Sequence, residues 1–107
     1  MPIYNKLVRD KILEIIKGEG LKCKSKILDP DELLVELKAK MVEEAHEFIK
    51  SADEKEAVEE LADILELIYA SLESYGVDFE ELELIRQKKK EKRGGFDKAI
   101  YLIEVEE

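Results

Sequence analysis

The sequence has few of the residues on which several common kinds of site depend. It has one cysteine, Cys23, in 107 residues, which excludes a disulfide framework within the chain and fits a reducing compartment. It also has one histidine, His46. A ferritin-like di-iron site uses two Glu-x-x-His motifs that project inward, whereas this chain has one, Glu43 to His46, on the polar side of its predicted helix. The sequence therefore argues against a di-iron centre.

Long apolar runs are absent as well. Nowhere do 18 apolar residues follow one another, and the first ten residues lack the apolar core of a signal peptide. We therefore expect a cytoplasmic protein without a membrane partner.

Positive charge is in deficit. The 18 Lys and Arg residues stand against 27 Asp and Glu residues, which gives a net charge of -9. This balance argues against binding to a nucleic-acid polymer, which needs net or clustered positive charge. Hydrophobic residues make up 45% of the chain, so it has enough apolar side chains for a core. Its length predicts a single domain over residues 1–107.

Capping signals and apolar periodicity predict four helices. Asp29 followed by Pro30 is typical of a helix start. Asp53 and Asp78 each precede a Glu by three residues, the spacing of a capping box. Glycines follow the expected ends of the first, third and fourth helices. The predicted helices cover residues 5–17, 30–51, 53–75 and 78–93.

Two short segments have the composition of β-strands. Residues 21–28 alternate strictly, with three lysines on one side, and residues 99–105 are rich in β-branched and aromatic side chains. Glutamates of the second segment could face the lysines of the first. We therefore predict a mainly α fold, a four-helix bundle with a small two-stranded β-sheet, completed by oligomerisation.

Acidic residues interrupt the apolar faces of the second and third predicted helices. Glu44 shares one face with Leu37, Met41 and Phe48. Glu60 and Asp63 lie beside the main apolar seam of the third helix, which we assign to Leu61, Leu65, Ile68 and Leu72. A buried carboxylate without a partner is expensive. A positive charge is therefore expected beside these acids.

The short connection between these two helices predicts that they pack antiparallel. That arrangement places Glu44 level with Asp63, and Glu47 level with Glu60. Four carboxylates that converge in this way favour a hard cation, Mg²⁺ or alternatively Mn²⁺. The alternative is that all four are solvated surface acids in a chain rich in glutamate.

Cations gather in two places that could contact a phosphate. Residues 86–93 hold six of the 18 cations, and Lys89 and Arg93 continue the apolar stripe of the fourth helix, so we predict that they bind phosphate. A solvated helix end is the alternative. Asn5 and Arg9 lie on or beside the buried face of the first helix and are candidate nucleotide-binding residues, although a surface role for Arg9 stays open.

Together these residues resemble the MazG-like all-α nucleoside triphosphate pyrophosphohydrolases. The family pattern stands here as Glu43-Glu44-Ala-His-Glu47 and Glu60-Leu-Ala-Asp63. The opening Tyr4-Asn-Lys-Leu-Val-Arg-Asp-Lys-Ile12 and the late Lys92-Arg-Gly-Gly-Phe96 are similar to a branch that is labelled phosphoribosyl-ATP pyrophosphohydrolase-like. This resemblance spans nearly the whole chain.

The resemblance implies Mg²⁺-dependent hydrolysis of a nucleoside triphosphate to the monophosphate and pyrophosphate. It makes Glu44, Glu47, Glu60 and Asp63 the metal ligands of the catalytic site, and it implies a homodimer or homotetramer. We expect an enzyme that removes noncanonical or surplus nucleotides. Two alternatives stay open, namely the phosphoribosyl-ATP enzyme of histidine biosynthesis and a non-catalytic helical module that binds a partner.

Overall fold

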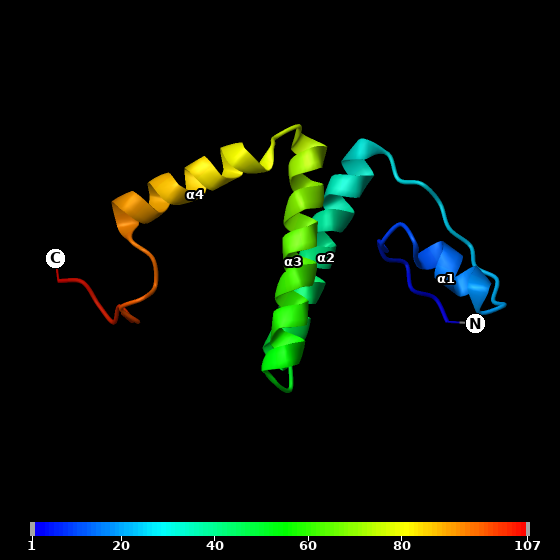
Figure 1. Cartoon of the computed structure of the whole chain (residues 1–107), viewed down its shortest axis with the longest axis horizontal. Helices are drawn as coiled ribbons and strands as arrows, with labels where there is room; N and C mark the ends of the chain where they lie inside the picture. The colour runs from blue at the N-terminus through cyan, green and yellow to red at the C-terminus, as the bar shows by residue number, and fades with distance from the viewer. Residues whose placement is uncertain (1, 107) are drawn as a thin grey trace. The chain divides into compact units, whose positions relative to one another are not determined.

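The computed structural model describes residues 2–106 and is helical, without a strand in that range. The helices are α1 (Ile12–Gly18), α2 (Pro30–Lys50), α3 (Glu54–Tyr75) and α4 (Phe79–Arg93) (Figure 1). The helical class is therefore confirmed. The residues group into two compact units, Met1–Gly76 and Val77–Glu107, which are described separately. The expectation of a single domain stays a prediction.

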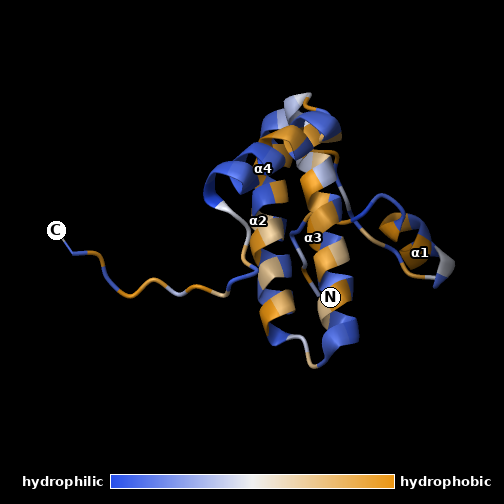
Figure 2. Ribbon diagram, turned by 60° about the vertical axis from the view of Figure 1, so that its left-hand side comes forward, coloured by the Kyte–Doolittle hydropathy of each residue, from blue (hydrophilic) through white to orange (hydrophobic). Residues whose placement is uncertain are grey.

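Helices α2 and α3 form an antiparallel hairpin, as Figures 1 and 2 both show. Each helix begins at a capping aspartate. The Asp29 carboxylate accepts a hydrogen bond from the Glu32 backbone N–H at 2.8 Å, and Asp53 accepts one from Glu56 at 2.9 Å. Such caps satisfy backbone donors that the first helical turn leaves unpaired. The predicted ranges of both helices are confirmed to within a residue.

The hairpin core contains one buried hydrophobic side chain from each helix. They are Leu37 of α2 and Leu67 of α3, which are 3% and 8% exposed. In contrast, Leu61 and Leu65, which we assigned to the main apolar seam of α3, are 47% and 44% exposed, so α2 leaves this part of the seam uncovered. Periodicity identifies an apolar face but not the partner that covers it, and α2 covers the face of Leu67 instead.

The N-terminal segment, which we define as residues 2–11, precedes α1 and is not helical. The predicted start of the first helix at residue 5 was therefore wrong. Asn5 has a φ of 43°, a left-handed conformation that asparagine tolerates but a right-handed helix does not contain. Helix α1 begins only at Ile12, and it ends at Gly18, close to the predicted end.

The predicted two-stranded sheet was wrong for the described residues. Residues 21–28 and 99–105 contain no strand, and their side chains are open to solvent, as in Ile27 at 95% and Ile103 at 88% exposed. A strand is stable only when its backbone groups are paired. Neither segment is paired in this way within the described residues, so the alternation of residues 21–28 and the composition of residues 99–105 were not sufficient to predict a sheet.

The unit Val77–Glu107 contains α4. Asp78 caps this helix by accepting a hydrogen bond from the Glu81 backbone N–H at 2.8 Å, and Gly94 follows its last residue, so the predicted range is confirmed. No residue of α4 is fully buried. None of the helices in residues 2–106 combines the length and apolar composition that crossing a bilayer requires.

Candidate metal centre

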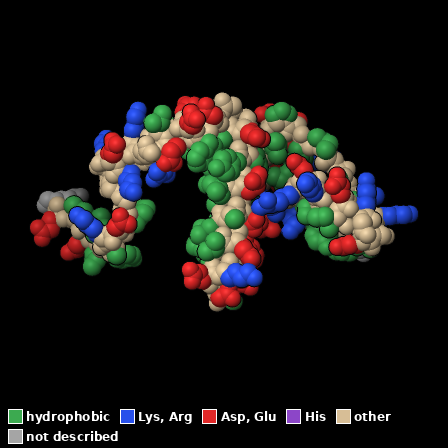
Figure 3. Space-filling view, viewed as in Figure 1, with side chains coloured by type: hydrophobic (Ala, Val, Ile, Leu, Met, Phe, Trp, Pro, Cys, Tyr) green, Lys and Arg blue, Asp and Glu red, His purple; other side chains and the backbone are tan. Residues whose placement is uncertain are grey.

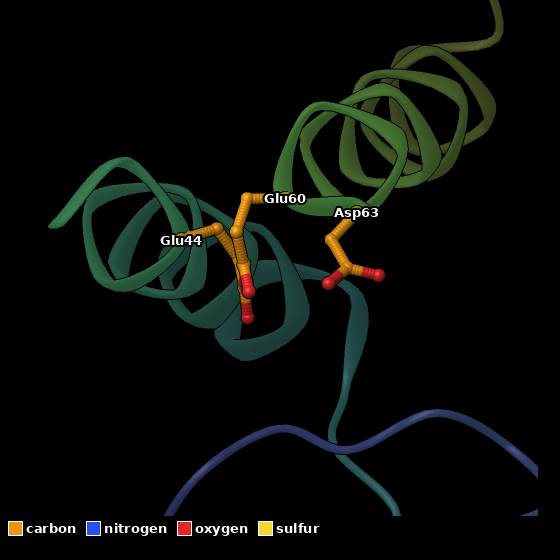
Figure 4. A group of neighbouring side chains, drawn as sticks. All are labelled: Glu44, Glu60 and Asp63. Atoms are coloured by element: carbon orange, nitrogen blue, oxygen red, sulfur yellow. The ribbon is translucent and has the colours of Figure 1, made fainter. Parts of the chain in front are cut away.

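Three carboxylates meet on one side of the hairpin. Glu44 comes from α2, and Glu60 and Asp63 come from α3, one turn apart. Each offers an oxygen atom that lies within 4.8 Å of the other two. Their side chains point to the same side of the hairpin (Figure 4). We call these three residues the acidic cluster.

The antiparallel packing of α2 against α3 places Glu44 beside Asp63, as the sequence predicted for residues at the same level of the two helices. Glu44 and Asp63 are neighbours, and the Glu44 side chain is only 13% exposed, in keeping with its place in an apolar stripe. Glu47 is exposed and is not one of the three clustered residues. The structure thus brings together three of the four predicted ligands, and their role as ligands stays a prediction.

Glu60 is the most perturbed group of the acidic cluster. Its pKa is raised from 4.5 to about 7, first by a hydrogen bond with Glu44, then by desolvation and by the negative charges of Glu44, Asp63 and Glu47. Two carboxyls share a hydrogen bond only when one of them is protonated. Glu60 Oε2 is shielded from solvent and has no hydrogen-bond donor among the described residues. When Glu60 is ionised, it therefore lacks a counter-charge of its own.

Two cations of the same unit contact the acidic cluster, and a third contacts the adjacent Glu43. The Arg9 Nη2 atom donates a hydrogen bond to Asp63 Oδ1 at 2.6 Å. Lys40 Nζ lies 3.8 Å from Glu44 Oε1 and 3.6 Å from Glu43 Oε2. The third cation, Lys6, is paired with Glu43 and so lies outside the acidic cluster. Cations thus already balance part of the negative charge.

Sequence reasoning missed Lys40. The signal was available, because Lys40 precedes Glu44 by four residues, a spacing that places two side chains on the same helix face. Arg9 was predicted to bind nucleotide, and in the structure it pairs with Asp63; the nucleotide-binding role of Arg9 and Asn5 stays a prediction. Asn5 makes no hydrogen bond to the acidic cluster within residues 2–106.

Lys89 and Arg93 belong to the unit Val77–Glu107. Neither forms an ion pair with any residue of the described range. Arg93 lines an open pocket of about 440 Å³ together with residues 94–100. Their neighbour Arg86 differs, because it pairs with Glu83, which raises the pKa of Arg86 and lowers that of Glu83. The predicted phosphate-binding role of Lys89 and Arg93 stays a prediction.

The donor set of the acidic cluster fits a metal ion. It consists of carboxylate oxygens, which hard divalent cations prefer. One of these oxygens, Glu60 Oε2, is buried without a donor, and a cation would satisfy it. The three residues could therefore hold a metal.

The chain matches the model of a known protein family. The model of the family described as phosphoribosyl-ATP pyrophosphohydrolase matches residues 20–90. This range contains α2, α3, most of α4 and the whole acidic cluster, whereas Arg9 lies outside it. No curated protein and no solved structure matches the sequence. The family match covers well over half of the chain, so the chain belongs to the phosphoribosyl-ATP pyrophosphohydrolase family, part of the MazG-like all-α nucleoside triphosphate pyrophosphohydrolase superfamily.

Proposed function

We propose that this protein is a Mg²⁺-dependent nucleotide pyrophosphohydrolase that cleaves a nucleoside triphosphate to the monophosphate and pyrophosphate. The family supports a pyrophosphohydrolase activity. The observation that carries the proposal is the acidic cluster, in which three carboxylate oxygens lie within 4.8 Å of one another and Glu60 Oε2 has no donor among the described residues.

In this proposal Glu44, Glu60 and Asp63 hold the metal, and Glu47 joins them as the fourth predicted ligand. The hard oxygen ligands favour Mg²⁺, with Mn²⁺ as the alternative. Bound divalent ions would neutralise the triphosphate and make a water molecule more acidic. Lys89 and Arg93 would bind phosphate oxygens through charge-assisted hydrogen bonds.

The substrate has two candidates that share this chemistry. One is a noncanonical or surplus nucleoside triphosphate, whose removal would be a house-cleaning activity. The other is phosphoribosyl-ATP of histidine biosynthesis, which the description of the matching family favours. Both reactions release pyrophosphate, and no residue of the described site indicates which base or sugar the substrate carries.

A nucleotide panel with Mg²⁺ tests the proposal. Pyrophosphate release should be measured for canonical and noncanonical triphosphates and for phosphoribosyl-ATP, with the Glu44→Gln variant as the inactive control. We expect one class of triphosphate to be hydrolysed by the wild type alone. Absence of pyrophosphate release from every member of the panel would favour the non-catalytic module.

We also propose that the enzyme is a homodimer or homotetramer. Support comes from apolar side chains that the described chain leaves open on both helices of the hairpin. Examples are Val42 of α2, 60% exposed, and Leu61 and Leu65 of α3. Hydrophobic residues appear on the outer faces of both helices in Figure 2. Sedimentation should give a mass above the 12.4 kDa of one chain, and a compact monomer at micromolar concentration would contradict it.

A further inference from the structure

The N-terminal segment crosses the acidic side of the hairpin and is held there by two ion pairs. Lys6 Nζ lies 3.5 Å from Glu43 Oε1, and Arg9 Nη2 lies 2.6 Å from Asp63 Oδ1. The segment passes beside the acidic cluster in Figure 4, and basic side chains meet a column of acidic ones there in Figure 3. Of these two cations, only Arg9 contacts a member of the acidic cluster.

The setting of Arg9 allows its guanidinium to leave Asp63. Its side chain is 58% exposed, and the segment that carries it has no helix or strand to fix it. Lys40 is different, because it belongs to α2, is 17% exposed and contacts two acids of its own helix. An exposed ion pair that joins residues 54 positions apart contributes little stability. Arg9 is therefore the more easily displaced of the two cations.

The Arg9 guanidinium has N–H groups left to donate to a second acceptor. Arg9 has five N–H donors, and its hydrogen bond to Asp63 uses the Nη2 group, without another acceptor in the described part of the chain. Guanidinium groups bind phosphate oxygens in a bidentate manner and stay charged at all physiological pH values. A triphosphate held beside the acidic cluster would lie close to these donors.

We propose that Arg9 is a transferable counter-ion. It neutralises Asp63 while the acidic cluster holds no divalent cation, and it moves to phosphate oxygens of the substrate once that cluster is filled. This inference rests on the proposed function. Asp63 Oδ1 cannot serve a guanidinium and a metal ion equally, so Arg9 weakens metal binding in the absence of substrate. Substrate draws Arg9 away from Asp63, so metal and substrate each strengthen the binding of the other.

Calorimetric titration of the nucleotide-free protein with Mn²⁺ tests the first half of the proposal. The Arg9→Gln variant should bind Mn²⁺ about two- to fivefold more tightly than the wild type, the size expected for losing one exposed ion pair. The matched control is Lys6→Gln, which removes the same charge from the same segment but whose partner, Glu43, lies outside the acidic cluster. Its Mn²⁺ affinity should change less.

Binding of inorganic tripolyphosphate at saturating Mn²⁺ tests the second half. Arg9→Gln should weaken tripolyphosphate binding by about tenfold, as expected for losing a hydrogen bond to a charged group. The two affinities should thus move in opposite directions in one variant. The Arg9→Lys variant keeps the charge but loses the planar fork, so it should bind Mn²⁺ like the wild type and bind tripolyphosphate less tightly.

The outcomes separate this inference from the proposed function. If wild-type protein does not bind Mn²⁺, the proposed function fails and the counter-ion role fails with it. If wild-type protein binds Mn²⁺ but Arg9→Gln has the affinity of the wild type or of Lys6→Gln, only the counter-ion role is overturned. Equal tripolyphosphate affinities in the wild type and Arg9→Gln overturn the transfer to phosphate.

Discussion

The α2–α3 hairpin and the segments that flank it differ in how much of their surface they bury. The hairpin contains the two buried hydrophobic side chains of the described residues, whereas residues 21–28 and 94–106 contain none. The hairpin also carries all three members of the acidic cluster. The flanking parts carry Arg9, Lys89 and Arg93, the cations with a predicted role at phosphate.

This difference indicates a division of labour. A hairpin with capped helices and a shared core can hold carboxylates at fixed distances, and a metal site needs fixed ligands. Arg9 lies in a segment without helix or strand, and Lys89 and Arg93 lie in the last turns of α4 with exposed side chains. Such exposed side chains can adjust to a ligand. The hairpin should therefore determine metal binding, and the flanking segments should determine the affinity for substrate.

The largest expected effect concerns a cluster residue of the hairpin. Glu44→Gln keeps the size of the side chain but removes an anionic ligand, so hydrolysis should fall more than about 100-fold, beyond the range for residues that only support a ligand. The control is Glu59→Gln on the exposed side of α3, which should retain activity. Steady-state pyrophosphate release measures the activity of both variants. Retained activity in Glu44→Gln would contradict the claim that the hairpin determines metal binding.

A smaller effect is expected from the flanking cations. Changing Lys89 and Arg93 to Ala should raise the KM for the triphosphate by about tenfold or more, because each charge-assisted hydrogen bond to phosphate is worth roughly 1.5–3 kcal/mol. The affinity for Mg²⁺ should change little. Wild-type kinetics in the double variant would show that these residues form only a solvated helix end.

Stability should also be concentrated in the hairpin. Asp53→Ala removes the cap of α3 and should lower the free energy of unfolding by about 1 kcal/mol. Ile27→Ala and Ile103→Ala alter side chains that are 95% and 88% exposed and should each change it by less than about 0.5 kcal/mol. Urea unfolding measures all three. A large loss from Ile103→Ala would indicate that its segment is buried in an oligomer.

A pH dependence of stability is expected to originate at Glu60. Its pKa is about 7 in the folded chain against an ordinary value of 4.5, so the folded state binds more protons than the unfolded state between these values. The contribution of Glu60 therefore lowers the stability of the metal-free protein as pH rises from about 4.5 to about 7. Thermal melts in EDTA across this window should show the decline in the wild type and a weaker decline in Glu60→Gln. Identical pH profiles of the melting temperature in the wild type and Glu60→Gln would contradict Glu60 as the origin of the pH dependence.

Much of the hairpin could be predicted from the sequence because its signals are local. Asp29 and Asp53 mark the helix starts, and a connection of three residues leaves the helices no option but to pack antiparallel, which fixes Glu44 near Asp63. The strands at 21–28 and 99–105 were mispredicted because alternation and β-branched composition indicate that a segment can form a strand but do not supply the second strand that pairs with it.

The same limit applies to two features nearer the site. The apolar seam with Leu61 was identified from periodicity, which does not say which surface covers it, and α2 leaves Leu61 exposed. The contact between Arg9 and Asp63 joins residues far apart in the chain. Local sequence patterns do not predict such a contact, because it depends on where the N-terminal segment lies.

The most direct test of the metal site is the effect of Mg²⁺ on thermal unfolding of the wild type and of Glu44→Gln. A ligand that binds only the folded state raises the melting temperature, so Mg²⁺ should stabilise the wild type. The variant loses one carboxylate ligand and one repelling charge. It should melt at or above the temperature of the metal-free wild type, and Mg²⁺ should shift it much less. Equal Mg²⁺ shifts in the two proteins would contradict the assignment of Glu44 as a metal ligand.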